Sequence, residues 1–232
     1  MYRSEFCISV SNLKPKTMNA QAIIEKHIAD DNFPCLMGKS TLKSDTLKIV
    51  DYQYFNNVES TRKLYQDLLT FTKSVEGNSK KFYSFIASFS LEKIRSEKQF
   101  ETVMWQQLQL LNSVDNYSWD GTVSDNPEDN SFSFSVGGKA FYIVGMHPKS
   151  SRLSRQCPIP AMVFNLHYQF ENLKASGKYQ VMKKKIRDND ATVQGNLNPM
   201  LEDFGQSSEA RQYSGRAVDN RWKCPFLNQN RV

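Results

Sequence analysis

Residues 131–148 have the sequence SFSFSVGGKAFYIVGMHP, and this stretch decides the fold that we predict. From Ser131 to Val136, serine alternates with phenylalanine or valine, which is the pattern of a strand with one buried face. Gly137-Gly138 predicts a two-residue hairpin turn, because both central positions of such a turn need positive φ. A partner strand from Lys139 to about Val144 then delivers Gly145-Met146-His147-Pro148 to a loop that can present side chains to a cleft.

The segments on either side of this hairpin alternate between helical and extended patterns. Apolar spacing predicts helices over residues 18–30, 60–71 and 97–111, strands over 46–55, 82–90 and 161–165, and a helix of some twenty residues from His167. After Asn189 the periodicity fades, and about forty residues of irregular composition close the chain. We therefore predict an α+β fold: a single domain with a mainly antiparallel sheet packed by several helices, and a long irregular C-terminal segment.

The C-terminal segment carries large apolar side chains that disordered segments seldom have. They are Met200, Leu201, Phe204, Tyr213, Trp222, Pro225 and Phe226. Disorder is the alternative that composition alone allows, since an irregular tail of this length is usually functional or disordered. We expect this tail to wrap back over the domain and cover a site.

Length and cysteine content restrict the class of protein. A chain of 232 residues is long enough to bury a core without a disulfide or structural metal, and its four cysteines lack the CxxC spacing of a zinc ribbon. The chain has neither a signal-peptide pattern at its start nor an apolar run of about 18 residues. We expect a cytoplasmic protein with reduced thiols and no membrane partner, whose residues 1–15 are flexible.

The charge distribution argues against a nucleic-acid partner, although the net charge is +6 and the isoelectric point about 9.0. Lysines and arginines are spread along the chain. The one dense run, Lys183 to Lys185, is expected near the end of a helix, where cations complement the helix dipole. The sequence contains neither an RNP-like motif nor a helix-turn-helix signature.

Six short segments resemble, in unbroken order, those of the YqcI/YcgG family. They are FPC (33–35), SFSVGGKAFYIVGMHPKSSR (133–152), VFNLHYQFENL (163–173), NPML (198–201), SEARQYSGR (208–216) and WKCPF (222–226), so the resemblance covers about residues 33–226. The family includes a heme-dependent enzyme that N-hydroxylates a cyclic guanidine. The resemblance implies a heme b protein that uses oxygen or peroxide to insert an oxygen atom into an N–H bond of a small guanidino or amino substrate. With oxygen as oxidant, an external reductant is expected.

A heme requires an axial ligand, and Cys224 is the first candidate, since a thiolate pushes electron density onto iron and favours O–O cleavage. The alternative is a buried cysteine that packs beside Trp222 and Phe226. His147, at the end of a strand, and His167, at a helix start, are rival ligands; either has a structural or substrate-binding role as its alternative. Cys35 is a lesser ligand candidate for which we expect a core position.

Cationic and acidic residues supply the remaining candidates. Arg152, Arg211 and Arg216 are expected to hold heme propionates or a substrate carboxylate, whereas a solvated surface position is expected for Arg155. Glu209 is the candidate to hold a cationic substrate, with an internal salt bridge to Arg211 as the alternative. For Tyr213 we consider a hydrogen bond to the activated oxygen, or simple packing.

The favoured function is therefore a heme-dependent oxygenase that N-hydroxylates a guanidino or amino group of an amino-acid-like substrate. A non-catalytic heme or small-ligand binding protein is the second interpretation. A cysteine-dependent hydrolase using Cys35 and His167 is the third, and the sequence has no G-x-S-x-G nucleophile elbow.

Overall fold

The computed structural model describes residues 19–77, 81–196, 200 and 204–229. Residues 1–15, which we expected to be flexible, lie outside the described residues, as do Leu201 and most of the NPML segment. Among the described residues, no helix is long and apolar enough to cross a membrane.

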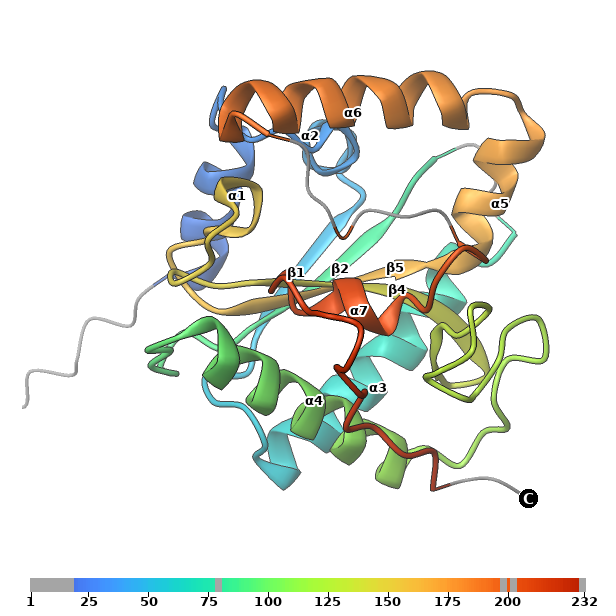
Figure 1. The fold of residues 1–232 in the computed structure, drawn as a ribbon. Coiled ribbons are helices and arrows are strands. Elements are labelled where there is room, and N and C mark those ends of the chain that lie inside the picture. Colours follow the sequence, from blue (N-terminus) through green and yellow to red (C-terminus); the bar gives the residue numbers. More distant parts are fainter. Residues whose placement is uncertain (1–18, 78–80, 197–199, 201–203, 230–232) are drawn as a thin grey trace, which may run out of the picture.

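A mixed five-stranded sheet in the order β1-β2-β5-β4-β3 forms the centre of the molecule (Figure 1). The strands are β1 (Leu47–Asp51), β2 (Ser84–Ser88), β3 (Phe134–Val136), β4 (Lys139–Met146) and β5 (Ala161–Leu166). Strands β1 and β2 are parallel, and the other neighbouring pairs are antiparallel. The prediction of an α+β domain with a mainly antiparallel sheet is confirmed.

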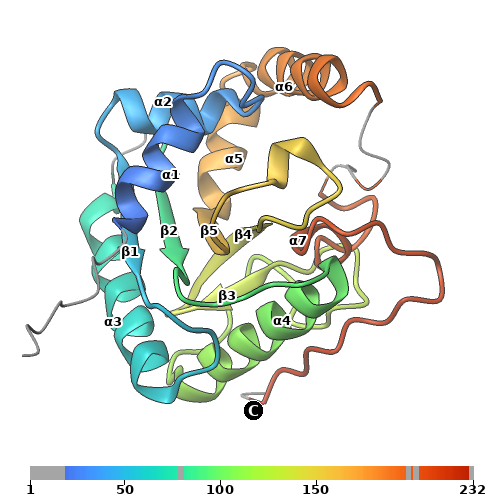
Figure 2. The same ribbon diagram turned by 90° about the vertical axis from the view of Figure 1, so that its left-hand side faces the viewer.

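Helices cover both faces of this sheet (Figure 2). They are α1 (Ala20–Ala29), α2 (Leu36–Lys43), α3 (Val58–Val75), α4 (Glu97–Val114), α5 (His167–Ala175), α6 (Tyr179–Gln194), α7 (Ala210–Tyr213) and a short 3-10 turn (Leu153–Arg155). Helices α3 and α4 lie on one side, and α1, α2 and α6 on the other, with α5 descending from α6 to the sheet.

The central hairpin has the predicted turn. Gly137 and Gly138 have φ of 63° and 71°, which matches the positive φ required at both central positions of the two-residue turn. Val136 pairs with Lys139 across this turn. A Cβ atom on Gly137 would lie only 2.3 Å from Leu69 of α3, so close packing as well as conformation favours glycine here.

Two predictions about helices were wrong. The helix expected to run for some twenty residues from His167 is interrupted after Ala175, where Gly177 has a φ of 71°, and continues as α6. Lys183–Lys185 consequently lies inside α6, whose last turn contains no basic residue, so the dipole explanation does not hold. Helix α2 was not predicted, because its eight residues carry few apolar side chains.

Strand alternation gives the sheet two different faces. The packed face is formed by Phe85, Phe141, Ile143 and Phe164 together with their neighbours in one large core under α3 and α4. The ring of Phe164 makes edge contacts with Phe85 at 6.4 Å and with Phe141 at 5.9 Å. The opposite face, which we call the cleft face, is formed by Ser84, Ile86, Tyr142, Val144, Met146, Val163 and Asn165.

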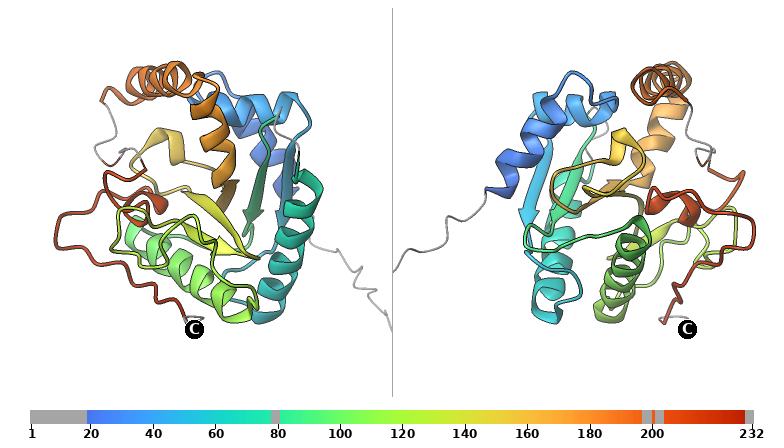
Figure 3. Two further views of the ribbon diagram at one scale, coloured as in Figure 1. Left: turned by 90° about the vertical axis from the view of Figure 1, so that its right-hand side faces the viewer. Right: turned by 60° about the vertical axis from the view of Figure 1, so that its left-hand side comes forward.

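The C-terminal tail folds back over the domain, as expected (Figure 3). Helix α7 packs on β4, and the chain then runs along α4. Trp222 and Phe226 lie 6.4 and 6.3 Å from the ring of Trp105 in α4, and the Leu227 amide donates to Gln109 at 2.9 Å. One part of the tail therefore belongs to the packed core, and the part around α7 reaches the edge of the cleft face.

Candidate functional site

An apolar cleft lies on the cleft face of the sheet, between the strands and helices α2, α5 and α6. It consists of two adjoining pockets of about 920 and 1080 Å³, volumes that include some open solvent. Both pockets share four lining residues: Met37, Tyr142, Phe170 and Ile186. We call the smaller one the Glu209 pocket and the larger one the Cys35 pocket.

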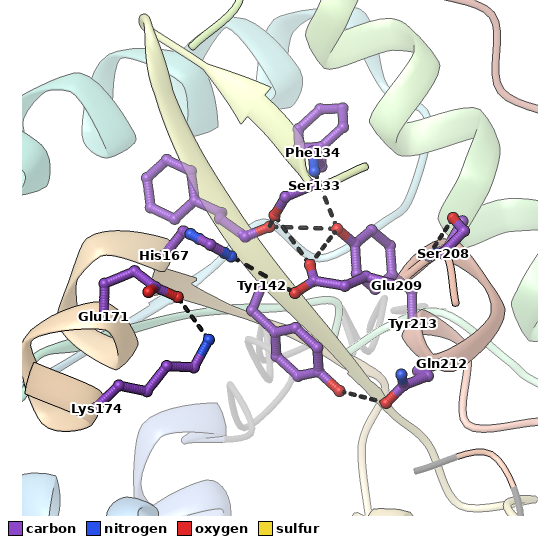
Figure 4. A network of polar contacts seen from close by, with 12 residues as sticks. Ser133, Phe134, Tyr142, His167, Glu171, Lys174, Ser208, Glu209, Gln212 and Tyr213 are labelled. Carbon is purple, nitrogen blue, oxygen red and sulfur yellow. Dashed lines mark hydrogen bonds and ion pairs between the residues drawn. The ribbon is translucent and has the colours of Figure 1, made fainter. Parts of the chain in front are cut away.

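A buried carboxyl forms one wall of the Glu209 pocket (Figure 4). Glu209 precedes α7 and is 4% exposed. The Ser133 hydroxyl donates to its Oε2 at 2.9 Å, and the Tyr213 hydroxyl lies 3.2 Å from the same oxygen. Burial raises the pKa of Glu209 to about 8, although the hydrogen bonds from Ser133 and Tyr213 stabilise the ionised carboxylate and so lower the pKa in part. The carboxyl is therefore mostly protonated at pH 7.

Tyr213 lies behind this carboxyl. It is fully buried, and its hydroxyl accepts a hydrogen bond from the Phe134 amide at 2.9 Å. It does not line either pocket of the cleft. The Tyr213 hydroxyl thus links Glu209 to the backbone of β3, which supports a role in orienting the carboxyl. The role considered from the sequence, a hydrogen bond to the activated oxygen, has no support from this geometry.

His167 begins α5 and lines the same pocket. Its Nε2 lies 3.8 Å from Glu209 Oε1, which is longer than a hydrogen bond, and its ring packs edge-on against Phe204 at 4.4 Å. Burial lowers the pKa of His167, so the imidazole is neutral at pH 7. The two side chains are neighbouring neutral groups and do not form an ion pair.

The Cys35 pocket contains a thiol at the start of a helix. Cys35 caps α2, and its Sγ accepts from the Gly38 amide at 3.5 Å. Burial raises the pKa of this thiol, while the backbone amides of the first turn and the positive charge of Arg155 favour the thiolate. The sequence interpretation, which expected a core position for Cys35, missed that its sulfur belongs to the wall of the cleft.

Arg155 is the cation of this pocket, and the expectation that it is a surface residue was wrong. It is 7% exposed and lines the Cys35 pocket. Its guanidinium donates to the backbone oxygens of Gly145 at 3.1 Å and of Gln212 and Tyr213 at 3.2 Å. It thus connects β4 to α7 and leaves a positive charge buried beside the cleft.

The other two ligand candidates lie away from the cleft. His147 follows β4 and stacks on Phe100 of α4 at 4.2 Å, because strand alternation turns it to the packed side. Its Nδ1 accepts from the Lys149 amide at 3.2 Å, and burial lowers its pKa to about 4. Cys224 lies beside the packed core, where burial raises the pKa of its thiol to about 12. These positions do not support heme ligation from the cleft.

The three arginines expected to hold propionates have other partners. Arg152 pairs with Asp190 of α6, Arg216 pairs with Glu101 of α4 at 2.6 Å, and Arg211 donates to the backbone oxygen of Asp219 at 2.8 Å. The Arg211 side chain lies at a separate surface pocket, so the alternative salt bridge to Glu209 is not formed. The basic residues that do line the cleft are Arg155, Lys174, Lys183 and Arg187.

Within the part of the chain that the structure describes, no three His, Cys, Asp or Glu side chains form a group that could hold a metal ion. A heme iron needs only one or two protein ligands, so its site does not require such a group.

Comparison with known proteins agrees with the segments quoted above. The model of the YqcI/YcgG family matches residues 24–227. The uncharacterized protein YqcI of Bacillus subtilis (strain 168) is 25% identical over 213 residues, covering 88% of this chain and 84% of its own length. The uncharacterized protein YcgG of the same organism is 25% identical over 206 residues, covering 84% of this chain and 81% of its own length. No solved structure gives a significant match. The family model spans most of this chain, which therefore belongs to the YqcI/YcgG family.

Proposed function

We propose that this protein is a heme-dependent oxygenase that N-hydroxylates a guanidino or amino group of a small amino-acid-like substrate. The observation that carries the proposal is one apolar cleft with a helix-capping thiol in one pocket and a buried carboxyl in the other. The first group is of the kind that holds iron, and the second is of the kind that selects a cation. Tyr142 is one of the residues that line both pockets.

The residues of the Cys35 pocket are suited to a heme. Apolar side chains such as Ile28, Val144 and Val163 line it, as a porphyrin requires. Coordination deprotonates a thiol outright, and helix-start amides stabilise the resulting thiolate, so the raised pKa of free Cys35 is no obstacle. A bound heme would supply the activation of oxygen or peroxide. We accordingly assign the axial ligand to Cys35 in place of Cys224.

The basic residues around the cleft are suited to the heme propionates. Lys174, Lys183 and Arg187 project from α5 and α6 into the lining of the Glu209 pocket, and Arg155 lies in the other. They take the role that the sequence interpretation gave to Arg152, Arg211 and Arg216, because those three arginines do not line either pocket of the cleft.

The protein's own groups would bind the substrate at the opposite end. Glu209 and His167 line that end, and Tyr142, whose hydroxyl donates to Gln212 at 3.0 Å, is part of the wall that the two pockets share. Holding the reacting nitrogen in one orientation and excluding water are the two contributions that such a wall makes to oxygen insertion. An external reductant is needed if oxygen is the oxidant.

A cysteine-dependent hydrolase is less well supported. The hydrolytic nucleophile is a thiolate, and burial raises the pKa of Cys35. No metal would be present in a hydrolase to offset that shift.

Absorption spectra of the protein expressed with ample heme test the proposal. We expect a Soret band and, for the ferrous carbonyl complex, the red shift that a thiolate ligand produces. Cys35→Ser should abolish the red shift, whereas Cys224→Ser, on the packed side, should retain it. Incubation with L-arginine and peroxide should then yield an N-hydroxylated product by mass spectrometry.

Each outcome has a definite reading. If the protein neither contains nor binds heme, the oxygenase function is wrong. A heme that binds without any turnover of guanidino or amino compounds would indicate the non-catalytic binding protein. A red shift that survives Cys35→Ser but disappears in Cys224→Ser would return the axial ligand to Cys224.

A further inference from the structure

We propose that four aromatic side chains, Tyr142, Tyr213, Trp105 and Trp222, form a path along which single electrons pass between the cleft and the protein surface. We call this set the aromatic path. Its function is to reduce an oxidant that forms in the cleft when no substrate is there to consume it. The inference rests on the proposed function for the source of that oxidant, a compound of the peroxide class, and on geometry for everything else.

The four rings follow one another at contact distance. Tyr142 of β4 lines both pockets of the cleft, and its ring centroid lies 6.0 Å from that of Tyr213 in α7 (Figure 4). Tyr213 stacks on Trp105 of α4 at 5.7 Å, and Trp105 lies 6.4 Å from Trp222 of the tail. These centroid separations are those of aromatic pairs in contact, so each ring touches the next.

The identity of these rings sets the path apart from the core around it. Tyrosine and tryptophan give up one electron far more readily than phenylalanine does. The neighbouring rings of the core are Phe132, Phe134 and Phe226, which cannot take part in such a transfer. Tyr213 and Trp105 are buried, whereas Trp222 is partly exposed and lines the separate surface pocket. The path is therefore enclosed in its middle and open at both ends.

The indole N–H of Trp105 favours a relay at this position. Its Nε1 is buried and has no hydrogen-bond partner among the described residues, which is uncommon for a buried polar group. An indole without an acceptor keeps its proton when it loses an electron. The oxidised ring then remains a strong oxidant and takes an electron from the next ring, because it cannot relax to a deprotonated radical.

Tyr213, in contrast, has a proton acceptor. Its hydroxyl donates to Glu209 Oε2 at 3.2 Å and lies 3.4 Å from the backbone oxygen of Phe141. A tyrosine loses its phenolic proton together with the electron. In its ionised form Glu209 takes this proton, and it returns the proton when Tyr213 is reduced. Glu209 thus keeps the oxidised phenol from losing its proton to solvent.

The overall reaction is balanced by an external one-electron donor. Two electrons carried along the path, with two protons from water, reduce one hydrogen peroxide to two molecules of water. Two donor molecules each lose one electron at Trp222, and every ring returns to its resting state.

The surface end of the path is suited to an anionic donor such as ascorbate. The Arg211 guanidinium lies 6.0 Å from the centroid of the Trp222 ring and lines the same surface pocket. Its charge makes the oxidised indole a stronger oxidant and attracts an anion. Glu128, which also lines this pocket, is paired with Lys223 at 2.7 Å.

Pulse radiolysis of the full chain without heme tests the path in the reverse direction. Azide radicals oxidise accessible tryptophan, and because Trp119 and Trp222 are both partly exposed, Trp119→Phe is the background that leaves Trp222 as the entry. The measurement is made at pH 9, where Glu209, with a pKa of about 8, is ionised. We expect the tryptophanyl absorbance to decay as the tyrosyl absorbance rises, at a rate independent of protein concentration. Trp105→Phe should abolish this phase.

Two buried tyrosines provide a matched pair of variants. Tyr213→Phe should abolish the transfer, whereas Tyr65→Phe, which removes a hydroxyl 3.0 Å from the Asp115 carboxyl, should retain it. Circular dichroism checks the fold of each variant. Transfer that survives in folded Trp105→Phe or Tyr213→Phe protein would overturn the inference. A rate proportional to protein concentration would overturn it as well, and that measurement in wild-type protein needs no variant.

Failure of this inference is distinguishable from failure of the proposed function. Heme binding and N-hydroxylation without radical transfer contradict only the aromatic path. Radical transfer through Trp105 and Tyr213 in a protein that binds no heme contradicts only the oxygenase.

Discussion

The two faces of the sheet differ in how completely they are covered. On the packed face, the long helices α3 and α4 lie against phenylalanine-rich strands and form one continuous core. On the cleft face, α1 and α2 bury a smaller cluster around Ile24 and Ile86, and α5 and α6 border the two pockets that lie beside it. Because adjacent residues of one strand point to opposite faces, the same strands supply both stability and site.

The largest effect is expected from removing a ring on the packed face. Phe164→Ala should lower the free energy of unfolding by about 3–5 kcal/mol, since its neighbours leave no room for collapse. The adjacent Val163→Ala, on the cleft face, should cost less than about 1.5 kcal/mol, because Val163 already borders a pocket. Urea denaturation compares the two. Equal losses would mean that the faces are equally packed.

A second prediction concerns the crossing of β4 with α4 and the tail. A Cβ atom at Gly145 would lie 2.5 Å from the Phe100 ring and 2.8 Å from the Tyr213 backbone oxygen. Gly145→Ala should therefore destabilise the protein by about 3 kcal/mol, measured as a loss of melting temperature. Gly121→Ala, where no atom lies within 4 Å, is the control. A stable Gly145→Ala protein would show that the tail is not held against β4.

A third prediction tests how the cleft is closed. Arg152 pairs with Asp190 of α6, and both side chains are buried. Arg152→Ala should lower the free energy of unfolding by about 2 kcal/mol. This loss is smaller than that for a rigid buried ion pair, because α6 can move and expose Asp190 to water. Hydrogen exchange should then increase in residues 179–194 and not in α4.

Its control is the exposed Lys63–Asp67 pair of α3, at 2.9 Å. Lys63→Ala should change stability by less than about 0.5 kcal/mol. If Arg152→Ala leaves exchange in α6 unchanged, this ion pair does not hold α6 over the cleft.

The last prediction is a change in pH dependence. Glu209 has its pKa raised to about 8 when folded, against an ordinary value of 4.5, so the folded protein retains a proton that the unfolded chain has released. Stability from this group is present at low pH and is lost as the pH rises toward 8. The Glu209→Gln protein lacks this loss. Between pH 5 and pH 8, its free energy of unfolding relative to that of wild type should rise by at least about 1 kcal/mol, as measured by urea denaturation.

Glu59→Gln, at an exposed carboxyl in the first turn of α3, serves as the comparison for this experiment, and its stability relative to wild type should not vary with pH in this way. A constant difference between Glu209→Gln and wild type across the range would mean that Glu209 is ionised in the folded protein. That result would place an unrecognised compensating charge beside it.

Predictions that depended on local periodicity were close to the structure. The hairpin at Gly137-Gly138, the helices over 60–71 and 97–111 and the strand over 82–90 were found within a few residues of their expected bounds. Turn chemistry and apolar spacing act over few residues, so the sequence carries them directly. The break at Gly177 was missed, although a glycine in a helical pattern is a recognised signal of helix termination.

The site was predicted less well. Glu209 and His167 line the cleft, whereas His147, Cys224 and three of the arginines do not. Strand alternation could have shown that His147 and His167 lie on opposite faces of the sheet. That inference requires the strand register, in which Tyr142 pairs with Asn165. That register puts Asn165 on the cleft face, with His167 two residues further on, and turns His147 to the other side.

By itself, then, the sequence determined most of the elements, the hairpin turn, the family segments and the presence in those segments of a thiol, imidazoles and a carboxyl. Only the tertiary structure decided which of these groups meet. It brought Cys35, Arg155, His167 and Glu209 to one cleft and assigned the other arginines to ion pairs and backbone contacts. The physical reason is that periodicity records which face of an element is buried, whereas strand register and the path of the tail arise from contacts between residues distant in sequence.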